Sequence, residues 1–251
     1  QKKEERVKET NVSRGFKVFG LIRKIRKISL WIFLIPIVAL NLCLYITINP
    51  EFLDNTIFYV EPLARASFSI PYIDGNLSIS RTARNYPTYL IFKPAMIITA
   101  IFVIKYWYSY NSLIKNINKD VIKYKYFLIF GVLSALFLIA HSIFLGVRFE
   151  YDLYKFFRRF ILLAFIIFEI VAQTLLVVSL YKIKEKVSEI INKKVLLLKI
   201  FLVSVLIITA FISLPFLLTS GRTHFKHALE WNYFVGIISF YLLTFLLWKK
   251  K

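Results

Sequence analysis

The chain has 251 residues, of which 58% are hydrophobic, and it carries 34 Lys and Arg against 14 Asp and Glu. Such a composition excludes an ordinary soluble domain, because mixed apolar and charged residues on this scale could neither pack nor insert into a membrane. The apolar residues fall instead into runs of about 20, the length at which a helix crosses about 30 Å of hydrocarbon. The runs are continuous rather than alternating, which excludes a membrane β-barrel.

Six apolar runs predict an all-α polytopic membrane protein, a bundle of six transmembrane helices. In chain order the predicted spans are 28–49, 88–108, 126–147, 159–181, 196–219 and 231–248. One membrane domain therefore covers 28–248. It is preceded by a basic tail at 1–27, interrupted by one long loop at 50–87 and followed by a basic end at 249–251.

The distribution of basic residues predicts the orientation. Six spans place both termini on one side, and that side holds 24 of the 34 Lys and Arg when residues inside spans are assigned to the nearer end. Cytoplasmic segments are enriched in Lys and Arg, so both termini and the segment 182–195 are predicted to be cytoplasmic. The net charge of +20 is then a topology signal that also attracts anionic lipid. No nucleic-acid-binding motif accompanies the charge, and we expect membrane lipids rather than nucleic acid as partners.

The loop 50–87, predicted to be lumenal, holds the most polar sequence of the non-cytoplasmic side. It contains the tripeptide Asn76-Leu77-Ser78, which is an N-glycosylation sequon. Asn76 is therefore a glycosylation candidate, and the protein a candidate glycoprotein.

Two segments carry a family resemblance. The stretch 78–92 (SISRTARNYPTYLIF) has an Ile-Ser pair, a following Pro and an Ile-Phe at the start of the second span, and 227–231 (HALEW) opens the last span with a Glu-Trp pair. Together they resemble the first-loop and closing motifs of the Frag1/DRAM/Sfk1 family. The chain departs from that family at the start of the fourth span, where members often carry a His and this chain has Tyr154 to Phe157.

The resemblance implies a function as well as a topology. It implies an integral endomembrane protein of the endoplasmic reticulum, Golgi or lysosome, with the plasma membrane as an alternative. Such a protein would handle or sense lipid, supporting remodelling of glycosylphosphatidylinositol (GPI) anchors or organelle membrane homeostasis, and the stretch 78–92 is closer to the GPI branch than to the autophagy-modulator branch. The expected role is non-catalytic and needs no cofactor, and membrane-protein partners stay open.

Arginines on the predicted lumenal side suggest a binding site for a lipid headgroup. A guanidinium donates two parallel hydrogen bonds to phosphate oxygens and stays charged at any physiological pH. The alternative is that these arginines pair with neighbouring acids or contact bulk lipid phosphate. The first loop is expected to fold back onto the start of the sixth span. The predicted polar site comprises Arg81, Arg84, Asn85, Arg148, Arg158, Arg159, Arg222, His227 and Glu230.

Histidines support a second hypothesis, an intramembrane metal-dependent lipid hydrolase or transferase. His224, His227 and Glu230 recur every three residues, and His141 lies in the outer half of the third span. Imidazoles and a carboxylate could hold zinc and activate water. The alternative is that the histidines face solvent or pair with carboxylates.

A polar pair in the fourth span supports a third hypothesis, a transporter or a subunit of a membrane complex. Glu169 lies near the middle of that span, and Gln173 follows four residues later on the same helical face. An ionisable group at that depth is costly unless it faces protein or water. Glu169 is thus either a proton-linked or substrate-contacting carboxyl, or a protonated group bonded to Gln173 or to a neighbouring helix.

Overall fold

The computed structural model describes residues 2–59, 68–117, 126–147, 152–218 and 221–249. These residues form seven α-helices and one short 3-10 helix, with no strand among them. The elements are α1 (Lys2–Ile48), η1 (Pro50–Leu53), α2 (Ile79–Ala83), α3 (Thr88–Ile117), α4 (Tyr126–Phe144), α5 (Asp152–Ile183), α6 (Lys193–Leu218) and α7 (Thr223–Leu247).

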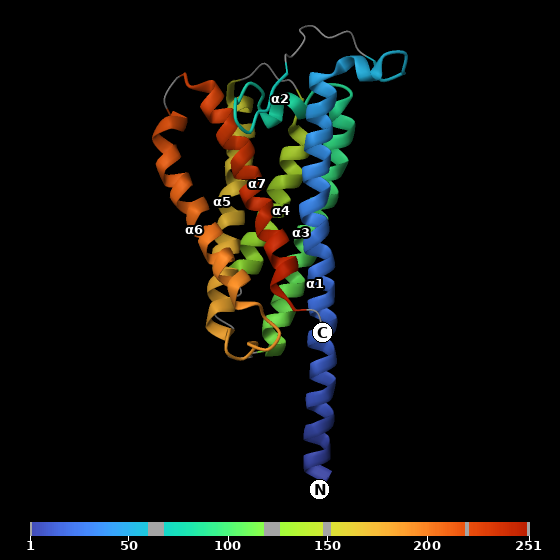
Figure 1. Cartoon of the computed structure of the whole chain (residues 1–251), viewed down its shortest axis with the longest axis vertical. Coiled ribbons are helices and arrows are strands. Elements are labelled where there is room, and N and C mark those ends of the chain that lie inside the picture. The colour runs from blue at the N-terminus through green and yellow to red at the C-terminus, as the bar shows by residue number, and fades with distance from the viewer. Residues whose placement is uncertain (1, 60–67, 118–125, 148–151, 219–220, 250–251) are drawn as a thin grey trace.

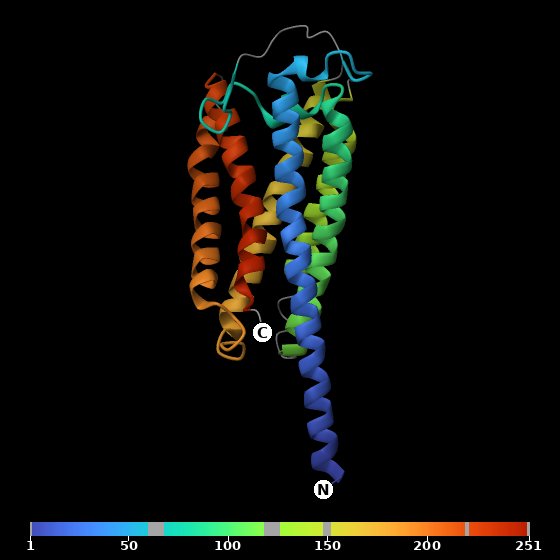
Figure 2. The ribbon, with the colours of Figure 1, turned by 45° about the vertical axis from the view of Figure 1, so that its right-hand side comes forward.

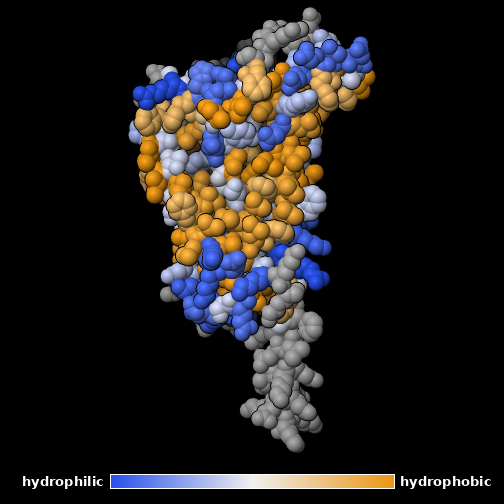
Figure 3. All heavy atoms as spheres, viewed as in Figure 1, coloured by the Kyte–Doolittle hydropathy of each residue, from blue (hydrophilic) through white to orange (hydrophobic). Residues whose placement is uncertain are grey.

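Six of the helices are long and apolar enough to cross a membrane, and the prediction of an all-α six-span bundle is confirmed. In Figures 1 and 2 these helices stand side by side, with α1 beside α3 and α6 beside α7. Figure 3 shows a belt of hydrophobic residues between two polar ends, as expected when lipid surrounds the middle of a bundle.

Five of the six spanning helices begin before or end after their predicted spans, whereas α4 ends at Phe144, short of its predicted end at 147. The largest difference is at α1, which begins at Lys2 although the apolar run begins only at Ile28. Lys, Glu and Arg favour helix, and the first proline of the chain is Pro36, so nothing in 2–27 ends the helix. The polar part of α1 therefore continues the spanning helix away from the bundle (Figure 1).

The two ends of the bundle differ. Both termini lie at one end, here called the terminal face, and α2 lies at the other, here called the loop face (Figure 1). At the terminal face the chain after α7 pairs with the connection between α5 and α6: Asn192 N–H donates to Leu247 O at 2.8 Å and Lys249 N–H donates to Ile190 O at 3.0 Å. Trp248 is buried there, and its Nε1–H donates to the Tyr110 hydroxyl at 3.1 Å.

Candidate functional site

A tight turn organises the described part of the long loop at the loop face. The Asp74 carboxylate accepts the N–H groups of Ile70 at 2.7 Å and Asn76 at 2.9 Å, together with the Ser69 hydroxyl at 2.9 Å. Burial raises the pKa of Asp74, but these donors and the charge of His224 outweigh it, so the pKa lies below its ordinary value. An aspartate that closes its own turn in this way fixes the backbone on both sides.

The turn docks on the first turns of α7 through backbone carbonyls. Trp231 Nε1–H donates to Leu77 O at 2.9 Å, and Asn232 Nδ2–H donates to Tyr72 O at 2.7 Å. His227 Nδ1 lies 2.9 Å from Gly75 O. Trp231 is fully buried, and its ring meets that of Tyr72 edge-on at 4.9 Å between centroids. The loop is therefore fixed to α7 by residues more than 150 positions away in the sequence.

Gly75 is required at the point of closest approach. Its φ is +61°, a conformation that glycine adopts without steric cost. A Cβ at this position would lie 1.8 Å from the backbone oxygen of His224 and 3.0 Å from the backbone nitrogen of Ala228. The backbone of α7 thus occupies the space that any other residue would need.

Glu230 binds the loop next to α2. Its carboxylate accepts the backbone N–H groups of Ile79 and Ser80, at the start of α2. The donors are backbone amides rather than the arginines to which the sequence pointed. Glu230 thereby fixes the segment that carries Arg81 without occupying its guanidinium.

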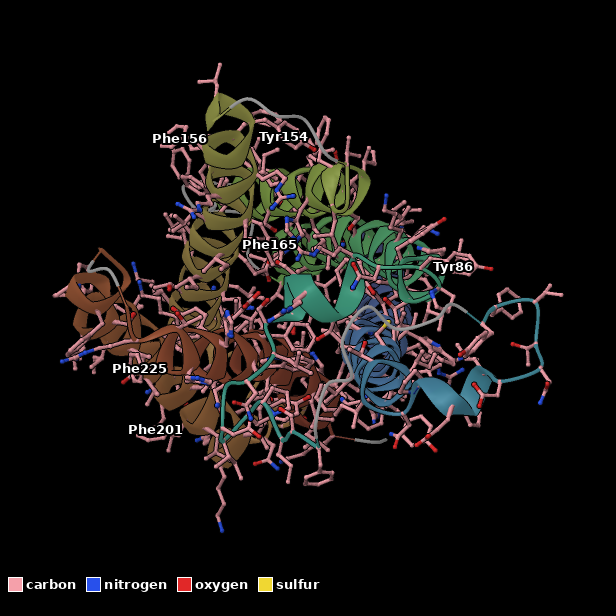
Figure 4. All side chains as sticks on the ribbon, turned by 90° about the horizontal axis from the view of Figure 1, so that it is seen from above. Tyr86, Tyr154, Phe156, Phe165, Phe201 and Phe225 are labelled. Atoms are coloured by element: carbon pink, nitrogen blue, oxygen red, sulfur yellow. The ribbon has the colours of Figure 1, made fainter. Side chains whose placement is uncertain are left out.

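Three of the residues expected to bind a headgroup lie on the docked loop. Arg81, Arg84 and Asn85 are exposed on or directly after α2, which covers the centre of the bundle in the view from the loop face (Figure 4). The backbone oxygen of Arg84 lies 3.0 Å from the Cβ position of Gly146, so the end of α2 also packs on the chain after α4. Asn76 of the sequon is exposed as well.

The other predicted arginines are spread over the loop face. The Arg158 guanidinium lies over the Tyr154 ring, 5.8 Å from its centroid, near the start of α5. The Tyr154 hydroxyl donates to Phe144 O at 3.0 Å, which ties this part of α5 to the end of α4. Arg159 is exposed, and Arg222 is an exposed residue that precedes α7. Arg148 lies outside the described residues.

The histidines of the hydrolase hypothesis do not assemble into a ligand set. His141 belongs to α4, whereas His224 is exposed and His227 contacts Gly75 at the start of α7. Among the residues that the structure describes, no group of three or more His, Cys, Asp or Glu side chains could hold a metal ion.

A second polar cluster lies inside the bundle around Glu169, which is 1% exposed. Three side chains from three helices donate to its carboxyl: Ser134 of α4 at 2.5 Å, Gln173 of α5 at 3.0 Å, and the Tyr241 hydroxyl of α7. Gln173 Nε2–H also donates to Ile237 O at 3.2 Å, which joins α5 to α7 at this level. The carboxyl therefore links three helices.

Lys199 of α6, which the sequence predictions did not include, is fully buried and contacts Thr244 of α7, one helical turn after the Tyr241 that bonds to this carboxyl. Its Nζ donates to Thr244 Oγ1 and to Phe240 O at 3.4 Å, and it lies 3.6 Å from the centroid of the Phe240 ring. Thr244 Oγ1 also lies 3.0 Å from the Tyr106 hydroxyl. The signal was available, because Lys199 is a lone cation within the apolar run 195–218.

The two halves of this cluster meet on α7 and α3. Tyr241 and Thr244 are three residues apart on one face of α7, and the Tyr106 ring contacts the Tyr241 ring edge-on at 4.8 Å between centroids. We call the set Ser134, Glu169, Gln173, Lys199, Tyr106, Tyr241 and Thr244 the intramembrane cluster.

Comparison of the chain with protein-family models, with curated proteins and with solved structures gave no match. The geometry of the two sites therefore carries the functional argument.

Proposed function

We propose that this chain is an integral endomembrane protein of the Frag1/DRAM/Sfk1 type that handles or senses a lipid with a phosphate-bearing headgroup at its loop face. GPI-anchor lipid, which contains phosphatidylinositol, is the class that the resemblance favours. One observation carries the proposal: the two segments on which the resemblance rests, 78–92 and 227–231, meet through Glu230, which faces the backbone N–H groups of Ile79 and Ser80, while the neighbouring Trp231 bonds to Leu77, directly before the first segment. Motifs that lie far apart in the sequence but meet at one site in the fold are best explained by a shared role at that site.

The chemistry of the docked loop supports a headgroup ligand. α2 and its C-terminal residue present the exposed side chains Arg81 and Arg84. Their backbone is held by Glu230 and by the packing of Arg84 on Gly146, so the backbone loses little conformational entropy when a ligand binds. A phosphate approaching from the headgroup layer would meet two guanidinium groups on a fixed support.

Lipid titration followed by native mass spectrometry tests the proposal, with phosphatidylinositol as the ligand and phosphatidylcholine as the comparison. Each charge-assisted bond to phosphate contributes about 1.5 to 3 kcal/mol, so R81A/R84A is expected to weaken phosphatidylinositol binding about tenfold or more. The matched control is R23A/K24A, which removes two exposed cations from α1 at the terminal face. The proposal fails if wild type does not prefer phosphatidylinositol, or if both double variants reduce binding equally.

A further inference from the structure

The intramembrane cluster contains one acidic side chain, Glu169, and one basic side chain, Lys199, and each faces partners suited to its charged form. Glu169 faces three donors and Lys199 faces two acceptors and the face of an aromatic ring. A carboxylate needs donors, and an ammonium needs acceptors or a π face. Both side chains are completely enclosed by protein, so each would be costly to ionise without the other.

One polar atom of the cluster is left over. Gln173 is fully buried, and among the described residues its Oε1 has no hydrogen-bond partner. A buried acceptor without a donor costs free energy, and such an atom in a native structure calls for a reason. The unused acceptor belongs to the same amide whose nitrogen donates to Glu169 at 3.0 Å.

We propose that Glu169 is an intramembrane binding site for a single proton, with Lys199 as its fixed counter-cation and Gln173 as the acceptor for the bound proton. The proton adds to a carboxylate oxygen of Glu169 and forms a carboxylic acid. Rotation of the Gln173 amide by half a turn then directs Oε1 toward this new O–H, and the unused acceptor gains its donor. No other covalent bond forms or breaks, the two hydrogen bonds of the Gln173 amide nitrogen are given up, and release of the proton reverses the step.

The ligand is a proton rather than a metal ion because the carboxyl oxygens are already occupied by hydroxyl and amide donors. A hard cation needs six or more oxygen ligands. Ser134, Gln173 and Tyr241 would all have to give up their hydrogen bonds to Glu169 before their oxygen atoms could bind such a cation. Lys199 would also repel it. The titratable side chains that face the site are Tyr106 on α3, Lys199 on α6 and Tyr241 on α7, and from α4 the site meets only the Ser134 hydroxyl among the described contacts.

Proton binding at this site acts on the contact between α5 and α7. With Glu169 ionised, Gln173 Nε2–H donates both to the carboxylate and to Ile237 O, which joins the two helices. Rotation of the amide removes both bonds at once. The protonated state therefore loosens α5 from α7 at mid-bundle, while the Tyr241 hydroxyl keeps its link to the carboxyl.

The terminal face is the side from which protons exchange. Lys199 lies six residues after the start of α6, about 9 Å along the helix, whereas Glu169 lies 14 residues before the end of α5, about 21 Å along it. Tyr106 contacts Tyr110 at 4.9 Å between ring centroids, and Tyr110 accepts the Trp248 indole N–H next to the chain end. Polar side chains thus continue from Lys199 to the terminal face, where the bundle ends.

Infrared difference spectroscopy of the whole chain in lipid nanodiscs tests the proposal, because the carbonyl stretch of a protonated carboxylic acid is separate from that of a carboxylate. Buried carboxyls and amines titrate between about pH 5 and about pH 9, so spectra are compared across that range. Glu230 is a second buried carboxyl and can contribute a band of its own. We therefore expect a carboxylic-acid band that disappears as the pH rises, survives in Glu230→Gln and is missing in Glu169→Gln/Glu230→Gln. In Lys199→Met the band should persist to higher pH, because the counter-cation is gone.

Three results would overturn the proposal. The wild-type band could be absent throughout the pH range or equally strong throughout it, and either outcome makes Glu169 a purely structural group. A titrating band that survives in Glu169→Gln/Glu230→Gln would assign the proton to another carboxyl. The wild-type spectra alone decide the first two outcomes. If a single variant does not fold, Glu169→Gln/Lys199→Met, which removes both charges together, is used in its place.

Discussion

Gly75→Ala should detach the long loop from α7 while leaving the bundle folded. The added Cβ would lie 1.8 Å from the His224 backbone oxygen, and helix backbone cannot yield to it as a flexible side chain could. A non-glycine residue at a φ of +61° costs a further 1 to 2 kcal/mol, roughly. The variant therefore avoids both penalties by opening the loop.

The magnitude follows from the bonds that hold the loop. Three hydrogen bonds between the turn and the side chains of α7 (His227, Trp231 and Asn232) contribute about 1 kcal/mol each. The clash and the strain together exceed this sum of about 3 kcal/mol, so the opening equilibrium of the loop should increase by about a hundredfold or more. Hydrogen exchange of the amides at 70–83, read by mass spectrometry, measures this change directly.

A second glycine provides the matched control. Gly221 also has a positive φ, +85°, but a Cβ there meets nothing within 4 Å. Gly221→Ala should therefore show only the strain of roughly 1 to 2 kcal/mol, and no faster exchange at 70–83. Unchanged exchange in Gly75→Ala, or equal changes in both variants, would refute the assignment of Gly75 as the contact point between loop and α7.

Gly131→Ala should lower the free energy of unfolding by about 1 to 3 kcal/mol, because its Cβ would lie 2.4 Å from three ring atoms of the buried Trp107. Differential scanning fluorimetry should show this as a lower melting temperature. Docking of the long loop should weaken in acid, because the pKa of Asp74 is lower in the folded protein than in the unfolded chain. The contribution of Asp74 to stability is therefore complete above about pH 3.9 and is lost as the pH falls through the folded pKa. Limited proteolysis of the loop at about pH 5 and at about pH 2 measures this change. Lys199→Met alone should destabilise the bundle by about 3 kcal/mol or more, and adding Glu169→Gln should recover part of that loss; melting temperatures that simply add would contradict the pairing.

The fold followed from the sequence because its cause is local. Six apolar runs of spanning length leave little choice of architecture, since a bilayer accepts only segments that satisfy their own backbone hydrogen bonds. The helix ends were less predictable. At α1 the polar residues before Ile28 are good helix formers, and hydropathy marks where the membrane begins rather than where the helix does.

The sites were predictable only where the contacts are made between side chains whose types and spacing are visible in the sequence. The spacing of Glu169 and Gln173 placed them on one face, and Gln173 does donate to Glu169. The donors to Glu230 are backbone N–H groups. Every residue type except proline carries such a group, so the sequence pattern could not single them out and pointed to an arginine partner instead. Lys199 could have been found by the same cost argument that singled out Glu169, because a lone cation in an apolar run needs an acceptor.

Both candidate sites use α7, and their separation along that helix decides how their tests relate. Glu230 and Tyr241 are 11 residues apart, so the loop contact and the intramembrane cluster lie about 16 Å from one another along the helix axis. Sites more than about 10 Å apart that share no side-chain partner usually respond independently to substitution. The loss of phosphatidylinositol binding in R81A/R84A and the loss of a titrating band in Glu169→Gln are therefore separate outcomes, and the lipid and proton proposals can fail one without the other.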